Sequence, residues 1–347
     1  MALQRTQRAQ STVEPAQTPA DPEVVENALR PRRLSEYVGQ KKIKEHLLIH
    51  IAAAKSRDEP LGHTLLHGPP GLGKTTLAHI VAQEMGAQMR VTSGPAIEKP
   101  GDLASLLTNL QKGDVLFIDE IHRLRPQIEE VLYGAMEDCV LDIMIGKGPT
   151  ARSVRLTLQP FTLVAATTKA GAISAPLRDR FLHAFKIGFY DAEEMRAIVE
   201  RSAGILRMEL GGRSAERVAG ASRATPRIAN RLIRAVRDFS HARGDHSVTD
   251  ACVEDTLRSL AVDEEGLDAT DRLLLTTIVD AFGGGPVGLS TLAAILAEEQ
   301  ETIEDVYEPY LLQQGYLQRT PKGRMATRKT YEKLRRSPEG APQPSLL

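Results

Sequence analysis

Two stretches of apolar residues at helical spacing flank a short apolar run in the first third of the chain. The spacing predicts one helix through about residue 55 and a second helix after residue 74. The apolar run at residues 63–67 predicts a strand between them. The positions that set the spacing are Ile43, Leu47, Leu48 and Ile51 in the first helix and Leu77, Ile80, Val81 and Met85 in the second.

Two further apolar runs, at residues 114–120 and 161–168, have the continuous apolarity of buried parallel strands. Helices are predicted on either side of the first run, at residues 101–112 and 126–138. Together with the first strand, these elements indicate a parallel sheet with flanking helices.

An alternating apolar pattern lies between these two buried strands. Apolar residues alternate on both sides of a turn at residues 146–149, which predicts a β-hairpin with Ile143 and Ile145 on its first strand. Two interpretations stay open from the pattern alone. The hairpin packs flat on the domain, or it projects and grips a partner with an apolar tip.

The rest of the chain is predicted to be mostly helical. Residues 191–261 look all-helical, with Asp191 as an N-cap. Pro226 suits a first helical position, which places Arg227 at a helix N-terminus. Residues 264–336 predict three helices, the third kinked at Pro309, and then two short strands, which is the order of a winged helix.

The strand at residues 63–67 leads into a phosphate-binding motif. Gly68 to Thr75 match G-x-x-x-x-G-K-[ST] without a mismatch, between a predicted strand and a predicted helix. Backbone N–H groups and the helix dipole can converge there on an anion. Lys74 can reach the β- and γ-phosphates, and the Thr75 hydroxyl can bind Mg²⁺.

A second cluster of candidate residues lies at the carboxyl ends of the later strands. Asp119 ends one strand and can hold Mg²⁺, and Glu120 can polarise a water for attack on the γ-phosphate. Thr168 ends the next strand, where a hydroxyl can orient that water. Arg178 and Arg180 are candidates for a finger that acts on a neighbouring subunit or for a phosphate contact.

The cysteine content indicates the cellular compartment, and the near-neutral net charge conceals a basic segment near the C-terminus. The 347 residues carry a formal net charge of −1, and the two cysteines, Cys139 and Cys252, fit a reducing cytoplasm. Residues 1–21 look like a disordered tail, and no apolar run has the length of a membrane span. Between residues 319 and 336 there are eight basic residues and one acid, the footprint of a phosphate-backbone binder.

The acidic third helix makes the position of the DNA contact unusual. It carries Glu304, Asp305 and Glu308, which flanking phosphates would repel from a major groove. We therefore expect the wing, with Arg319 and Arg324, to contact the DNA backbone without reading its sequence.

Several motifs, in order from about residue 25 to about 335, resemble the RuvB family of AAA+ ATPases, the bacterial Holliday-junction branch-migration motors. They are Gly68-Pro69-Pro70-Gly71-Leu72-Gly73-Lys74-Thr75, Ile118-Asp119-Glu120-Ile121-His122-Arg123-Leu124, Leu141-Asp142-Ile143-Met144-Ile145-Gly146, Pro176-Leu177-Arg178-Asp179-Arg180-Phe181, Ala224-Thr225-Pro226-Arg227 and Arg319-Thr320-Pro321-Lys322-Gly323-Arg324. One small departure is Ala224, where glycine is common in the family.

The resemblance implies a role for each matching position. ATP would contact Leu29, Arg30, Tyr37, Val38, Gly71, Gly73, Lys74, Thr75, Thr76, Arg180, Tyr190 and Arg227. Thr75 and Asp119 would hold Mg²⁺, while Asp119, Glu120, Thr168 and the finger Arg178 would act in hydrolysis. The hairpin with Ile143 and Ile145 would bind the junction-recognising protein RuvA, which favours its projecting form.

The expected fold is therefore an α/β AAA+ P-loop domain with an inserted β-hairpin (residues 1–190, the α/β domain). A small all-helical domain (191–261, the helical domain) and a winged-helix DNA-binding domain (264–347, the head domain) would follow. The expected function is ATP-driven branch migration in DNA recombination and repair by a cytoplasmic homohexamer. Its partners would be Holliday-junction and duplex DNA, RuvA and the RuvC resolvase, with no membrane.

Three other classes of ATPase compete with this assignment. An origin-binding initiator also combines an AAA+ domain with a winged helix, but the apolar hairpin and the acidic third helix disfavour it. A clamp-loader subunit lacks a terminal winged helix, and a protein unfoldase needs no basic wing.

Overall fold

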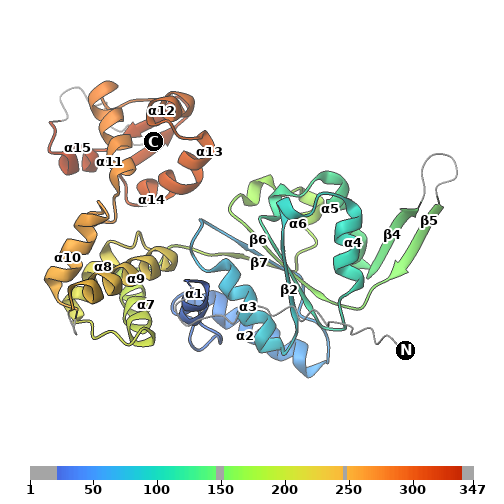
Figure 1. The fold of residues 1–347 in the computed structure, drawn as a ribbon. Coiled ribbons are helices and arrows are strands. Elements are labelled where there is room, and N and C mark those ends of the chain that lie inside the picture. Colours follow the sequence, from blue (N-terminus) through green and yellow to red (C-terminus); the bar gives the residue numbers. More distant parts are fainter. Residues whose placement is uncertain (1–21, 146–151, 245–247, 338–347) are drawn as a thin grey trace, which may run out of the picture.

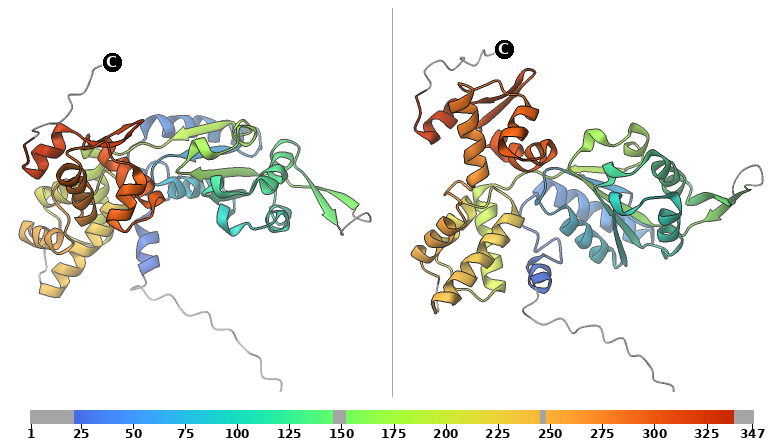
Figure 2. Two further views of the ribbon diagram at one scale, coloured as in Figure 1. Left: turned by 90° about the horizontal axis from the view of Figure 1, so that it is seen from above. Right: turned by 45° about the horizontal axis from the view of Figure 1, so that its top comes forward.

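The computed structural model describes residues 22–145, 152–244 and 248–337 of the chain (Figure 1). The tail predicted for residues 1–21 and the turn predicted at residues 146–149 lie outside the described residues. Within them, the elements group into an α/β body, a set of four helices and a head, as Figures 1 and 2 show from three directions.

The α/β domain is built on a five-stranded sheet with the order β2-β3-β6-β1-β7, and every pairing in it is parallel. The strands are β1 (Thr64–His67), β2 (Met89–Ser93), β3 (Val115–Asp119), β6 (Thr162–Thr167) and β7 (His183–Lys186). Because β6 lies between β1 and β3, the carboxyl ends of these three strands meet at one edge of the sheet.

Alternate residues along the strands enter two separate hydrophobic cores, because successive side chains point to opposite faces. Leu66, Phe117 and Val164 pack with the helices α2 (Lys41–Ser56) and α3 (Lys74–Met85). Their neighbours on the same strands pack with α4 (Pro100–Thr108) and α5 (Pro126–Glu137) on the other face. The predicted helix positions are confirmed, except that Leu48 is exposed instead of joining the core.

The predicted hairpin forms a separate two-stranded antiparallel sheet of β4 (Val140–Ile145) and β5 (Arg152–Thr157). In its register Ile143 pairs with Val154. Figures 1 and 2 show the pair extending away from the parallel sheet, so the projecting form is the one observed. The side chains of Ile143 and Ile145 lie outside the described residues.

Four helices follow the sheet: α7 (Ala192–Ile205), α8 (Gly212–Gly220), α9 (Pro226–Arg243) and α10 (Asp250–Ser259). The Asp191 carboxylate accepts a hydrogen bond from the Glu194 N–H at 2.8 Å, which confirms it as the N-cap of α7. Pro226 is the first residue of α9, as predicted. A helix that the sequence pattern did not predict, α1 (Pro22–Leu29), is joined to α7 where Arg201 donates to the Leu29 carbonyl at 2.7 Å.

The head domain has the predicted order of three helical segments and a two-stranded wing. The elements are α11 (Ala269–Thr276), a π-helix (Thr277–Ala281), α12 (Leu289–Leu296), α13 (Gln300–Thr302), a second π-helix (Ile303–Tyr307), α14 (Glu308–Gln313), β8 (Leu317–Thr320), β9 (Gly323–Ala326) and α15 (Arg328–Leu334). The third helix therefore changes its winding before Pro309, which fits because proline has no N–H to donate within a helix. The last helix, α15, was not predicted.

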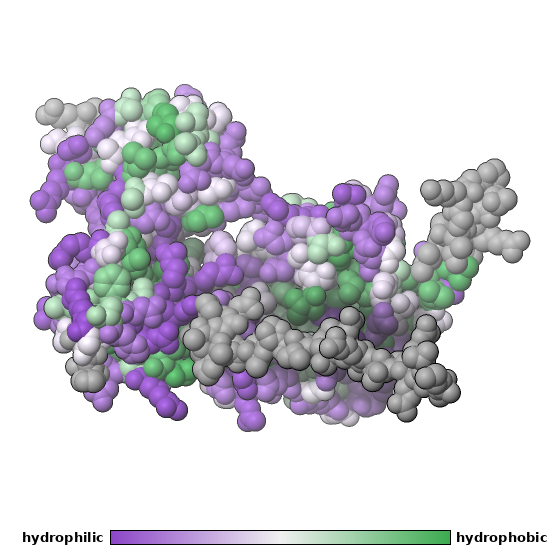
Figure 3. All heavy atoms as spheres, in the orientation of Figure 1, coloured by the Kyte–Doolittle hydropathy of each residue, from purple (hydrophilic) through white to green (hydrophobic). Residues whose placement is uncertain are grey.

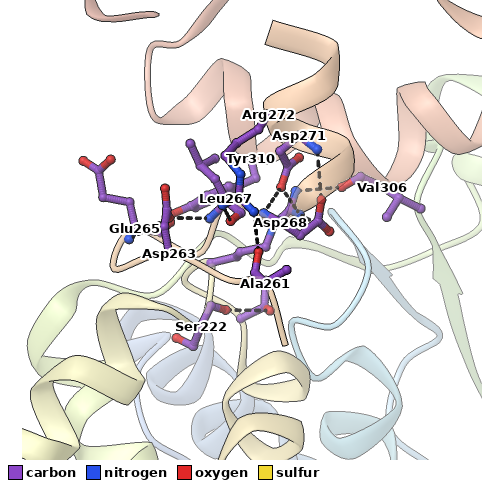
Figure 4. A network of polar contacts seen from close by, with 12 residues as sticks. Ser222, Ala261, Asp263, Glu265, Leu267, Asp268, Asp271, Arg272, Val306 and Tyr310 are labelled. Carbon is purple, nitrogen blue, oxygen red and sulfur yellow. Dashed lines mark hydrogen bonds and ion pairs between the residues drawn. The ribbon is translucent and has the colours of Figure 1, made fainter. Parts of the chain in front are cut away.

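A buried polar joint connects the helical domain to the head domain (Figure 4). Arg223 donates to the Asp271 carboxylate at 2.8 Å, and its guanidinium lies 4.9 Å from the centre of the Tyr310 ring. Arg223 also donates to the Val306 carbonyl at 3.3 Å. Arg223 is 7% exposed and Asp271 is fully buried, so the head domain is fixed to the loop before α9.

The surface in the orientation of Figure 1 is largely hydrophilic, with hydrophobic patches on each part of the molecule (Figure 3). Within the described ranges, none of the helices combines the length and apolar character that crossing a bilayer requires.

Candidate functional site: a nucleotide cavity at the sheet edge

A cavity of about 530 Å³ opens at the edge where β1, β3 and β6 end. Its lining joins the phosphate loop, the acidic end of β3, the end of β6 and the start of α9. The lining residues are Glu26, Leu29, Arg30, Pro70, Gly71, Gly73, Lys74, Thr75, Thr76, Asp119, Glu120, Thr168, Pro226, Arg227, Asn230, Arg231 and Arg234. The strand order thus brings together candidate residues that lie far apart in the sequence.

Lys74 is the buried cation of the phosphate loop. Its ammonium donates to the carbonyls of Gly68 and Pro69, both at 2.8 Å. Burial lowers the pKa of Lys74 to about 8, although the nearby Asp119 carboxylate acts in the opposite direction. The loop itself needs glycine, because Gly73 has a φ of 93° and Gly68 has no room for a Cβ beside the Ile187 carbonyl.

The acidic pair after β3 is oriented by its own backbone. Asp119 accepts a hydrogen bond from the Glu120 N–H at 2.9 Å, and Glu120 has a left-handed φ of 50°. The Glu120 carboxylate lies 3.3 Å from the Arg123 guanidinium. At the end of β6, Thr167 is hydrogen-bonded to His122 at 2.9 Å, and the next residue, Thr168, lines the cavity.

The start of α9 reaches the phosphate loop directly, because the Arg227 N–H donates to the Gly71 carbonyl at 3.3 Å. Arg231 and Arg234 follow Arg227 on the same face of α9 and also line the cavity. Within the described part of the chain, no ion pair involves any of these three arginines. The sequence interpretation assigned only Arg227 to the site, although the spacing of four and seven residues on one helix was the signal for the other two.

A smaller cavity of about 70 Å³ adjoins the first and shares Leu29, Arg30 and Gly73 with it. Leu29, Arg30, Tyr37, Val38 and Tyr190 are among its lining residues. The Tyr190 hydroxyl donates to the Tyr37 hydroxyl at 2.9 Å, and burial raises the pKa of Tyr37 to about 12. The two hydroxyls are thus held together in the lining of this cavity.

The two arginines near the end of the α/β domain lie outside both cavities. Arg178 is exposed at the end of α6 (Ala175–Arg178). Arg180 instead contacts α5, 3.0 Å from the Glu137 carboxylate and 4.3 Å from the centre of the Tyr133 ring. Neither arginine lines the two cavities in this arrangement.

The wing arginines are paired with the acidic helix. Arg324 donates to the Glu308 carboxylate at 2.6 Å and to Glu304 at 3.0 Å. Arg319 forms ion pairs with the same two carboxylates. The side chain of Glu308 is 1% exposed, so its charge is neutralised inside the head domain.

The cavity also fits a magnesium ion that arrives with a nucleotide. Thr75 and Asp119, two oxygen-bearing side chains, both line the cavity and would be the residues to hold the ion. Magnesium commonly takes one or two protein ligands and completes its shell with waters and phosphate oxygens. The described residues contain no group of three or more His, Cys, Asp or Glu side chains arranged to hold a metal.

Comparisons with known proteins agree across the chain. The Holliday junction DNA helicase RuvB P-loop domain matches residues 29–187, the RuvB AAA lid domain residues 190–263 and the RuvB C-terminal winged helix domain residues 264–335. A solved structure of the Thermotoga maritima RuvB Holliday junction branch migration motor is 47% identical, with a TM-score of 0.82, over 89% of this chain and 99% of that one. Two mutants of the Thermotoga protein, at 48% and 47% identity and the same coverage, each give a TM-score of 0.83. This chain therefore belongs to the RuvB family of Holliday junction branch migration motors, which are P-loop AAA+ ATPases.

Proposed function

We propose that this chain is an ATP-driven motor, of the helicase class, that forms a hexameric ring around duplex DNA. The ring pulls the DNA through a four-way junction bound by RuvA, and RuvC resolvase joins the larger complex. The observation that carries the proposal is the single cavity lined by Lys74, Asp119, Glu120, Thr168 and Arg227. That set supplies a phosphate-binding cation, two carboxylates, a hydroxyl and a cation on the helical domain.

Within one subunit, each residue has a task in hydrolysis. Lys74 binds the β- and γ-phosphates. Thr75 and Asp119 would hold Mg²⁺, which would supply positive charge beside the phosphate oxygens. Glu120 accepts the proton of the attacking water, and Thr168 orients that water. Arg227 contacts the γ-phosphate from α9, so loss of that phosphate changes the position of the helical domain.

The remaining contacts of the motor lie outside the cavity. Arg178 completes the active site of the neighbouring subunit; its exposed position and its absence from the lining of its own cavity support this role. The hairpin of β4 and β5 binds RuvA through Ile143 and Ile145. The wing binds the phosphate backbone of DNA through Arg319 and Arg324, with the exposed Lys322 between them.

Replacement of the proton acceptor tests the motor directly. Glu120→Gln should lower the rate of ATP hydrolysis by about 10²–10⁴-fold, the usual contribution of a general base, while the affinity for ATP remains. Branch migration of a synthetic four-way junction with RuvA should fall by the same factor. Glu130→Gln, an exposed acid on α5, serves as the matched control and should act like the unaltered protein. Normal branch migration by Glu120→Gln would exclude this role.

A further inference from the structure

The acidic third helix of the head domain has a second set of partners that DNA binding does not explain. Its four carboxylates, Glu301, Glu304, Asp305 and Glu308, lie within one run of eight residues. Glu304 and Glu308 neutralise the wing arginines, as described above. Glu301 and Asp305 instead face the α/β domain, and Figure 1 shows α13 on the side of the head domain nearest the sheet.

These two carboxylates form ion pairs with the α/β domain. The Lys169 ammonium lies 2.7 Å from Glu301 and 3.0 Å from Asp305. The Arg123 guanidinium lies 3.2 Å from Glu301. The contact therefore joins parts of the chain that are more than a hundred residues apart.

Both basic partners stand next to the hydrolytic residues. Lys169 directly follows Thr168. Arg123 ends the short 3₁₀-helix Ile121–Arg123 and also approaches Glu120, with 3.3 Å between its Nε and the carboxylate. One guanidinium thus bridges Glu120, at the nucleotide cavity, and Glu301, on the head domain.

We propose that the head domain docks on the α/β domain through Glu301 and Asp305 and, through Arg123, holds Glu120 away from its reactive position. This inference rests on the proposed role of Glu120. The ion pair with Arg123 ties the Glu120 carboxylate to the 3₁₀-helix, so the carboxylate is not free to turn toward an attacking water. Glu301 is a positioning residue, because it orients Arg123 toward Glu120.

The exposure of the contact makes it reversible. The side chains of Arg123 and Glu301 are 46% and 48% exposed, and exposed ion pairs are weak and screened by salt. The buried joint between Arg223 and Asp271 is the opposite case, with side chains that are 8% and 0% exposed. The head domain can therefore leave its docking contact while it stays attached to the helical domain. Engagement of the wing by DNA then releases Glu120.

Removal of the docking charge tests this proposal without altering the nucleotide cavity. Glu301→Gln should raise the kcat of ATP hydrolysis without DNA by about two- to fivefold, the range that a weak exposed ion pair allows, and leave KM unchanged. Stimulation by duplex DNA should shrink by the same factor. Glu299→Gln is the matched control, since Glu299 is exposed just before α13.

Two further measurements separate docking from a general effect on folding. Raising the salt concentration without DNA should increase kcat of the unaltered protein and not that of Glu301→Gln. Lys169→Asp should also raise kcat without DNA, and a second change, Asp305→Lys, should lower it again by restoring an ion pair. An unchanged or lower kcat in Glu301→Gln, with a normal melting temperature, would overturn the proposal. Activity that persists in Glu120→Gln would instead reject the proposed role of Glu120, whatever Glu301→Gln does.

Discussion

At the scale of single residues, Lys74 shows how the fold changes the chemistry of a side chain. The residue is 8% exposed, and burial opposes its charged form more than Asp119 supports it. Its ammonium is satisfied by two loop carbonyls that a bound phosphate would replace. The motif in the sequence identifies this lysine, but its lowered pKa follows only from the packing around it.

Nucleotide affinity should therefore depend on pH near the pKa of Lys74. Below pH 8 the Lys74 ammonium is charged, and the affinity for nucleotide should be constant. Above about pH 8 Lys74 loses its proton in the protein without nucleotide. Binding must then take up a proton, so the dissociation constant should rise by as much as about tenfold per pH unit. Titration of a fluorescent ATP analogue between pH 7 and pH 9.5 measures this. A flat profile would show that Lys74 keeps its charge throughout.

Arg178 and Arg180 allow a complementation test of the shared active site. An Arg178→Ala subunit keeps its own cavity, and a Lys74→Ala subunit keeps its arginines, so each should be inactive alone. Mixed rings should hydrolyse ATP, because a finger contributes about 10³–10⁵-fold to the rate. The same mixture with Arg180→Ala is the matched comparison. If only the Arg180→Ala mixture recovers activity, Arg180 is the finger and must leave Glu137 when subunits assemble.

At the scale of elements, the hairpin of β4 and β5 is independent of the parallel sheet. Ile143→Thr combined with Ile145→Thr should abolish RuvA binding, measured by co-sedimentation or surface plasmon resonance, and leave ATP hydrolysis without RuvA intact. Leu141 lies at the base of the hairpin and is 1% exposed, so its replacement tests a core position of the same strand for comparison. Leu141→Ala should destabilise the α/β domain by about 2–5 kcal/mol. Loss of hydrolysis in the isoleucine variant would place those side chains in the core instead.

The wing and the acidic helix form one structural unit, so a wing arginine affects stability as well as DNA binding. Arg324→Ala removes one of the two cations on the buried Glu308 carboxylate and should cost about 1–3 kcal/mol in unfolding free energy. Arg319→Ala should cost less, because Arg319 is 51% exposed against 12% for Arg324. Urea unfolding and DNA binding across salt concentrations measure the two effects. Equal stability of both variants would contradict this.

At the scale of the whole molecule, local pattern predicted most helices and three of the five strands of the parallel sheet, but neither β2 and β7 nor how the elements meet. The phosphate loop, the strands with Asp119 and Thr168, and the winged helix follow from periodicity and motif. The pairing of Glu308 with Arg324 could not be predicted, because it depends on the tertiary fold. The short helices α1 and α15 escaped prediction because each is stabilised mainly by packing against other elements. The roles of Arg123 and Arg223 likewise depend on contacts between domains.

Arg223 is the residue that should transmit motion from the nucleotide to the head domain. It lies four residues before Arg227, in the loop that precedes α9, and ends in the buried pair with Asp271. Arg223→Lys keeps the charge but cannot contact Asp271 and the Val306 carbonyl with one planar group. We expect it to hydrolyse ATP at a near-normal rate, while branch migration falls by about tenfold or more. A ratio of junctions migrated to ATP hydrolysed, measured in one reaction, reports this directly.

Stability and transmission at this joint can be separated by a double variant. Arg223→Ala alone should cost about 3–5 kcal/mol, because it leaves the Asp271 carboxylate buried without its cation. Arg223→Met with Asp271→Leu should recover most of that loss, since apolar side chains of similar volume often replace a buried ion pair without a penalty. If the polar joint fixes the angle of the head domain, branch migration stays impaired in this stable protein. Full recovery of branch migration would mean that the joint only holds the domains together.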